Sequence, residues 1–151
     1  MAAFDRETVL IYEGTPGQGW TKTLTPTPIQ TRGYGDLSLI VSIDQDDLAN
    51  IPETLALLIV DVDLNPSWES DRCSYPTDMF FIPRGMWISM WCGMSDMRIV
   101  HEMKLRTIPE NMVVMLAKGD QGLSSLVRVW AHVQYLTDDA IPIPAYVPPH
   151  T

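Results

Sequence analysis

The sequence predicts an all-β protein, an antiparallel β-sandwich of about seven or eight strands with a jelly-roll-like arrangement and only short helical turns. Three observations support this fold class. Several segments alternate apolar and polar residues, glycine and proline interrupt the chain every roughly 8–15 residues, and no segment sustains the period of about 3.6 typical of a helix. The 151 residues suffice for one core. We therefore expect a single sandwich domain, residues 1–140, and an extended proline-rich tail, residues 141–151.

Residues 1–64 contain three predicted strands. Residues 9–12 form a short apolar strand that leads into a glycine-rich loop, and residues 24–28 stay extended because their prolines lack an amide donor. Residues 37–44 are apolar at the odd positions, which predicts a half-buried strand. Residues 55–64 are apolar at every even position and at the first odd positions, so we expect the first half of this strand to be covered on both faces.

The rest of the chain contains five predicted strands, which follow an irregular stretch at residues 65–78. The strands are residues 79–82, 86–92, 97–108, 112–117 and 127–135. In the last of them the odd positions, from Val127 to Tyr135, are apolar and face inward, whereas the even positions face outward. We expect short helical turns at residues 46–49 and 120–125.

The charge balance argues against general nucleic-acid binding. The formal net charge is −9 and the basic residues form no cluster, so the chain gains nothing from releasing counterions from phosphates. No apolar run approaches the roughly 18–20 residues of a membrane-spanning helix, and residues 1–7 lack the basic and apolar segments of a secretory signal. We expect a cytoplasmic protein without a membrane span, or one that is matured elsewhere from a precursor.

No motif predicts catalysis, a cofactor or a metal. Gly14 and Gly19 have the spacing of a phosphate-binding loop, but Trp20 stands where that loop requires lysine, and no helix follows. The histidines, at positions 101, 132 and 150, are scattered, whereas zinc needs three or four converging ligands. No serine or cysteine has the surroundings of an activated nucleophile, so we expect a protein that is not an enzyme.

Acidic side chains gather at the ends of two predicted strands. They are Asp44, Asp46, Asp47, Asp61 and Asp63. If the two strands are neighbours, these carboxylates could converge on Ca²⁺, which prefers several oxygen ligands. The spacing matches no EF-hand loop, so a solvated acidic rim is the alternative.

Four aromatic residues are candidate interface or ligand-platform positions: Trp87, Trp91, Trp130 and Tyr146. Trp87 and Trp91 lie four apart on one predicted strand and therefore share a face. If the opposite face packs on the core, the two rings need a second cover, which is a loop, a neighbouring subunit or a stacked sugar. Trp130 faces outward on the last strand and leaves the same alternatives open. Tryptophan is enriched at the energetic centres of interfaces.

Residues 127–140, Val-Arg-Val-Trp-Ala-His-Val-Gln-Tyr-Leu-Thr-Asp-Asp-Ala, combine an alternating strand with an acidic turn, and the proline-rich tail follows. This pattern resembles the closing strand of single jelly-roll capsid proteins of picorna-like or other icosahedral viruses. The resemblance implies a virion protein that assembles in the host cell by self-association or with other capsid subunits, without direct contact to nucleic acid. The short acidic chain favours a minor, vertex, spike-base or protruding position. The alternative is a carbohydrate-binding sandwich that uses the surface tryptophans.

Overall fold

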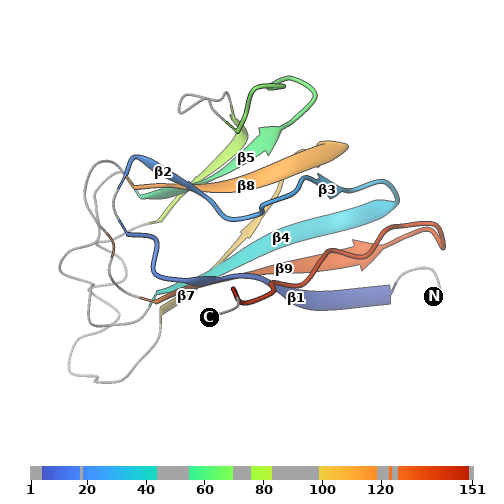
Figure 1. The fold of residues 1–151 in the computed structure, drawn as a ribbon. Helices are drawn as coiled ribbons and strands as arrows, with labels where there is room; N and C mark the ends of the chain where they lie inside the picture. Colours follow the sequence, from blue (N-terminus) through green and yellow to red (C-terminus); the bar gives the residue numbers. More distant parts are fainter. Residues whose placement is uncertain are drawn as a thin grey trace.

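The computed structural model consists of two β-sheets packed face to face, which confirms the predicted all-β sandwich (Figure 1). The structure describes residues 5–17, 19–43, 55–69, 76–82, 99–118, 123 and 126–149. The strands are β1 (Asp5–Gly14), β2 (Thr21–Thr23), β3 (Ile29–Gln30), β4 (Tyr34–Ile43), β5 (Ala56–Asp61), β6 (Pro76–Phe81), β7 (Ile99–Lys104), β8 (Asn111–Ala117) and β9 (Val127–Tyr135). Among the described residues, no helix has the length and apolar character needed to cross a membrane.

The strands pair in a nested scheme. The first sheet has the order β1-β9-β4-β7, and the second has the order β2-β8-β5-β6, with β3 also paired to β8. If β2 and β3 are counted as one interrupted strand, the first four strands pair in reverse order with the last four. β1 pairs with β9, β2 and β3 with β8, β4 with β7, and β5 with β6, all antiparallel. This is the pairing of one long hairpin rolled into two sheets, and the fold is therefore a jelly roll.

The core lies between the two sheets and follows the alternation in the sequence. The odd positions of β9, from Val127 to Tyr135, are at most 1% exposed, and the even positions are partly exposed. The odd positions of β4 from Leu37 to Ile43 are fully buried. Leu57 and other side chains of the second sheet belong to the same apolar cluster. The inward faces predicted for these two strands are confirmed.

Several strand boundaries differ from the predicted ones. β6 begins at Pro76 rather than at residue 79, because β6 is an edge strand and its first residue needs no ladder donor. β1 begins at Asp5 rather than at residue 9, because its polar first half also pairs with β9. β2 and β3 were not predicted; they lie on either side of Pro26 and Pro28 and are correspondingly short.

Three predicted elements cannot be compared in full. The strand at residues 86–92 and the helical turn at residues 46–49 lie outside the described residues. Of the turn at residues 120–125, Leu123 is described, and it forms an antiparallel bridge with Gly17.

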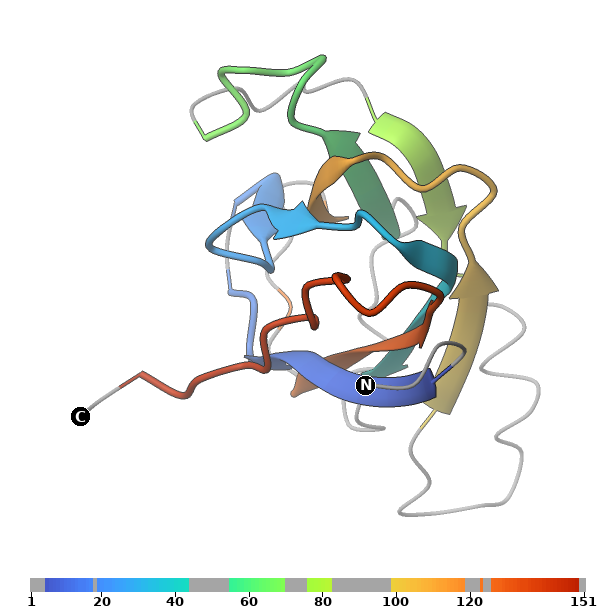
Figure 2. The same cartoon turned by 90° about the vertical axis from the view of Figure 1, so that its right-hand side faces the viewer.

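The sandwich has two flanks, where the edge strands of different sheets lie beside one another (Figure 2). On the flank of β6 and β7, the two sheets are linked through the carboxylate of Asp78, a β6 residue that is 4% exposed. Its Oδ2 accepts a hydrogen bond from the Arg106 backbone N–H at 3.0 Å, and its Oδ1 accepts one from Arg106 Nη2 at 3.2 Å. Arg106 follows β7, so these bonds tie the second sheet to the first.

On the opposite flank, the tail runs back from β9 between β1 and β3 (Figure 2). Ala140 and Ile143 are buried there and belong to the core cluster, and Tyr146 packs against it. The tail therefore covers the flank of its own sandwich.

Replacing Asp78 by alanine is expected to lower the free energy of unfolding by about 1–3 kcal/mol, because the Arg106 backbone N–H loses its acceptor within the flank. The control is Arg106→Met, which removes only an exposed guanidinium, and exposed ion pairs contribute about 0–1 kcal/mol. Urea unfolding followed by fluorescence compares the two variants. Equal losses would contradict the dominant role of the backbone hydrogen bond.

Candidate interaction surfaces

The aromatic residues predicted as candidates do not form one site. Trp87 and Trp91 lie outside the described residues. Trp130 lies on the outer face of the first sheet, and Tyr146 lies in the tail on the flank of β1 and β3. The two described candidates therefore belong to different surfaces.

The outer face of the first sheet has mixed polarity around Trp130. The half-buried indole stands in register with Leu10 of β1 and Ile40 of β4. In the adjacent row, Thr8 Oγ1 and His132 Nδ1 share a hydrogen bond of 2.7 Å. An indole beside hydroxyl and imidazole groups can stack on a sugar ring or pack against another protein.

The outer face of the second sheet is apolar instead. Val60, Val113 and Met115 form a satellite cluster on this face. Trp68, from the turns that follow β5, belongs to the same cluster and is 7% exposed. An antiparallel sheet normally turns a polar face to water. A second apolar face therefore needs a cover of its own, which Trp68 supplies in part.

The apolar face continues onto β6, where it is exposed. Met79 pairs with Leu58 and Phe81 pairs with Ala56, so both side chains point away from the core. Met79 is 43% exposed and Phe81 is 64% exposed, and Leu58 is half-buried. We call Leu58, Met79 and Phe81 the β6 strip. This strip was not predicted from the sequence.

The backbone edge of β6 is partly closed to further strands. Asp78 Oδ1 accepts a hydrogen bond from the Met79 N–H at 3.0 Å, so this amide already has an acceptor. Pro76 at the start of the strand has no amide donor. Charged residues and prolines are common means of protecting sheet edges. Contact through the side chains of the β6 strip is therefore favoured over strand pairing.

Tyrosine hydroxyls fix the tail to the sandwich. Tyr34 Oη donates a hydrogen bond to the Ile141 carbonyl at 2.5 Å, and Tyr135 Oη accepts one from the Ile143 N–H at 3.1 Å. Tyr135 Oη also bonds Glu7 Oε2 at 3.0 Å. Burial, with smaller effects from Tyr135 and Glu7, raises the pKa of Tyr34 far above its usual value. The neutral hydroxyl that the tail requires is thus favoured.

The close approach of the tail requires glycine at position 33. Gly33 has a φ of +85°, which residues with a side chain rarely adopt. A Cβ atom there would also overlap Thr137 Oγ1. The Gly33 carbonyl accepts a hydrogen bond from the Leu136 N–H at 2.7 Å, which starts the return of the chain.

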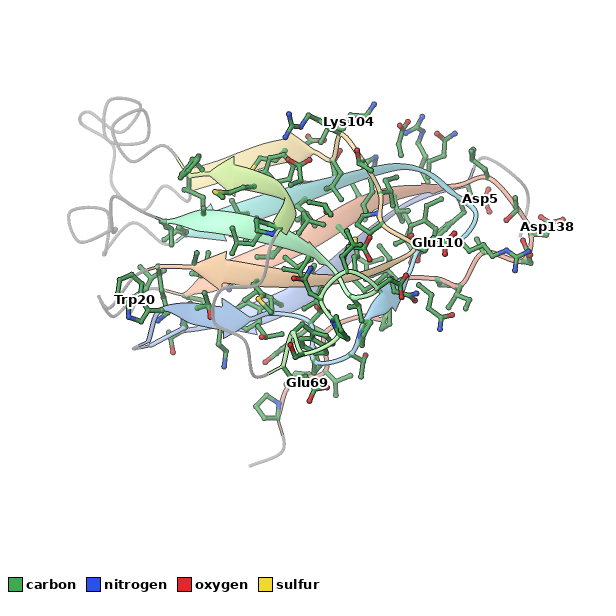
Figure 3. The ribbon with its side chains drawn as sticks, turned by 90° about the horizontal axis from the view of Figure 1, so that it is seen from above. Asp5, Trp20, Glu69, Lys104, Glu110 and Asp138 are labelled. Atoms are coloured by element: carbon green, nitrogen blue, oxygen red, sulfur yellow. The ribbon has the colours of Figure 1, made fainter. Side chains whose placement is uncertain are left out.

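A buried lysine holds the loop that was considered for phosphate binding. Lys118 is 0% exposed, and its Nζ donates a hydrogen bond to the Gly19 carbonyl at 2.5 Å. The Lys118 backbone N–H donates a hydrogen bond to the carbonyl of Trp20. Trp20 is half-exposed and lies at the end of the molecule opposite Asp138, which follows β9 (Figure 3). The loop turns the Gly19 carbonyl oxygen toward the Lys118 ammonium, whereas a phosphate site needs free amides.

The acidic residues considered for Ca²⁺ are not brought together by neighbouring strands. β4, which precedes residues 44–47, belongs to the first sheet, whereas Asp61 ends β5 in the second sheet. The premise that the two strands are neighbours is wrong. Asp61 Oδ1 instead accepts a hydrogen bond from the Asp63 N–H, and Asp63 Oδ2 accepts one from Asn111. Residues 44–47 lie outside the described residues, among which no group of histidine, cysteine and acidic side chains could hold a metal ion.

Comparisons with known proteins identify no family for this chain. No family model matches it, and no curated protein matches it. Its structure is similar to part of the dimeric latent PorU from Porphyromonas gingivalis, with a TM-score of 0.36 and 11% sequence identity. The similarity covers 89% of this chain and 13% of that chain. It is too weak to carry an argument about function.

Raising the pH above about 10 is expected to destabilise the protein through Tyr34. An unfolded tyrosine titrates near pH 10, and the pKa of Tyr34 is raised in the folded state. The native state therefore keeps the proton longer, and the stabilisation present below about pH 10 is lost as the pH rises toward the folded pKa. Calorimetry should show an unfolding temperature that falls from about pH 9 to about pH 11, less steeply in Tyr34→Phe. The same pH dependence in both proteins would exclude this contribution.

Proposed function

We propose that this chain is a structural protein that acts by self-association, as a component of a viral capsid. In this proposal it performs no catalysis and needs no cofactor, and its partners are copies of itself or other capsid subunits within the virion. The jelly roll supports the proposal because capsid proteins commonly use this fold, although lectin domains use it as well. The resemblance at residues 127–140 points in the same direction.

The observation that carries the proposal is the exposed β6 strip. A large aromatic and a methionine side chain project from a sheet face that also carries the apolar cluster of Val60, Val113 and Met115. Exposed apolar patches of this kind mark contact sites in soluble proteins. The flexible methionine side chain can also adapt to more than one partner surface. This property suits a subunit whose contacts with neighbouring subunits differ in geometry.

A two-fold contact satisfies the geometry of this face. In a symmetric pair the same patch serves both subunits, so Phe81 of each copy can pack on Leu58 and Met79 of the other. The Asp78 carboxylate already occupies the Met79 amide, so the two sheets meet by their faces rather than extend one another. This contact is the interface that the proposal requires.

The double variant Met79→Ser/Phe81→Ser is expected to weaken self-association by about tenfold to a hundredfold, because two exposed apolar anchors are lost. Sedimentation velocity over a range of protein concentrations measures the effect. Ile141→Ser is the matched control, since its side chain is 50% exposed but lies in the tail. Unchanged association in the double variant, or an equal loss in the control, would contradict the role of the β6 strip.

Electron microscopy of the purified protein tests the capsid part of the proposal. Closed rings or shells are expected, because a closed symmetry uses up every contact surface. A protein that remains monomeric at high concentration, with the β6 strip intact, would overturn the proposal.

A carbohydrate-binding module is the second candidate, and the position of Trp130 favours it. The half-buried indole lies on a sheet face next to the Thr8–His132 pair, where a sugar could stack and form hydrogen bonds. Trp130→Ala should then abolish binding on a glycan array while Phe81→Ser leaves binding unchanged. Absence of glycan binding by the unaltered protein would remove this candidate.

A further inference from the structure

An apolar groove lies on the flank that the tail covers. Its volume is about 430 Å³, within the range of roughly 300–1,000 Å³ typical of small-ligand pockets. The floor contains Ile11, Leu24 and Ile29, each at most 4% exposed. These side chains come from β1, from the segment after β2 and from β3, so the groove lies where the two sheets separate.

The tail supplies the second wall of the groove. Residues 144–147 line it, and Tyr146 is held in place on both its backbone and its ring. Its N–H donates a hydrogen bond to the Leu10 carbonyl at 2.7 Å. Its ring meets that of Tyr12 edge to face, with centroids 6.0 Å apart. The groove is therefore complete only when the tail is docked.

The charge of the groove is unlike that of the whole protein. The chain has a formal net charge of −9, yet no carboxylate lines this groove, and Lys22 is its one charged lining residue. Within the described part of the chain, Lys22 makes neither an ion pair nor a hydrogen bond. An exposed ammonium at the side of an apolar groove is complementary to a ligand with one negative charge and an apolar body.

We propose that this groove binds an aliphatic carboxylate, with the alkyl chain on the floor and the carboxylate paired with Lys22. An alkyl chain fits the aliphatic side chains of the floor, and its burial supplies most of the affinity. The exposed ion pair adds a smaller, orienting contribution. The site is separate from the β6 strip, which lies on the outer face of the second sheet, so this inference does not depend on self-association.

A bound ligand would also stabilise the docked tail. The ligand contacts a wall formed by residues 144–147, so it binds the docked arrangement and shifts the equilibrium toward it. Chymotrypsin cleavage after Tyr146 reports this shift, because the bond to Val147 is cut when the tail leaves the groove. Sodium decanoate is expected to slow the release of the fragment that begins at Val147, measured by mass spectrometry.

Titration with sodium decanoate and with 1-decanol tests the site itself. The unaltered protein should bind decanoate saturably, and methyl NMR should place the largest shifts at Ile11, Leu24 and Ile29. Lys22→Met should weaken decanoate binding by about threefold to tenfold and leave decanol binding unchanged. Lys104→Met is the matched control, since Lys104 pairs with Asp36 at 3.2 Å on the first sheet, and it should bind decanoate normally.

Three results would overturn the proposal. One is the absence of saturable binding of decanoate by the unaltered protein. Another is equal decanoate affinity in Lys22→Met and the unaltered protein. The third is a set of methyl shifts confined to the outer face of the second sheet, which would place the ligand on the β6 strip. The titrations measure ligand binding to the groove of the monomer, whereas sedimentation measures association through the β6 strip. Failure of the titrations would therefore not contradict the proposed self-association.

Discussion

The structure depends on one constraint: a rolled hairpin yields two sheets that share no strand, so both flanks must be closed by contacts other than strand pairing. Buried polar groups of the backbone need partners wherever the sheets separate. On one flank Asp78 provides them for Arg106. On the other flank Tyr34 and Tyr135 provide them for the returning tail. The Asp78–Arg106 and Tyr34–Ile141 links join residues 28 and 107 positions apart in the sequence, which makes the closure a property of the complete fold.

Much of the fold could be predicted because the inward faces of the long strands are uniformly apolar. β4 and β9 have this pattern, and their odd positions are buried as expected. β2 and β3 could not be predicted in the same way, because Pro26 and Pro28 interrupt the strand and leave segments too short for a periodic signal. The pairing order also eludes a single sequence, since each alternating strand could pair with several others. The calcium hypothesis depended on this order, because it required β4 and β5 to be neighbours, and the two strands belong to different sheets.

The candidate surfaces were only partly predictable. Alternation along β9 correctly placed Trp130 on an outer face. The β6 strip was missed because residues 79–82 are apolar at every position, so period two gives no indication of which side is buried. The structure shows which face of β6 is buried, because Phe80 packs against the core whereas Phe81 is exposed. The position of the tail could not be predicted either. Its prolines predict an extended chain, but they do not indicate on which flank of the sandwich that chain packs.

The two outer faces differ in polarity. The first sheet carries paired charges, including Arg128 with Glu13 at 2.7 Å, which keep their surroundings hydrated. The second sheet carries a buried apolar cluster, and beside it Met79 and Phe81 are exposed. A large contact between subunits buries apolar surface at its centre and leaves charges at its rim. The second sheet therefore suits a contact with another protein, and the first sheet suits water or a polar ligand. The groove belongs to neither face, since the tail that closes the flank also forms its wall. A ligand bound to that wall would therefore stabilise the flank as well.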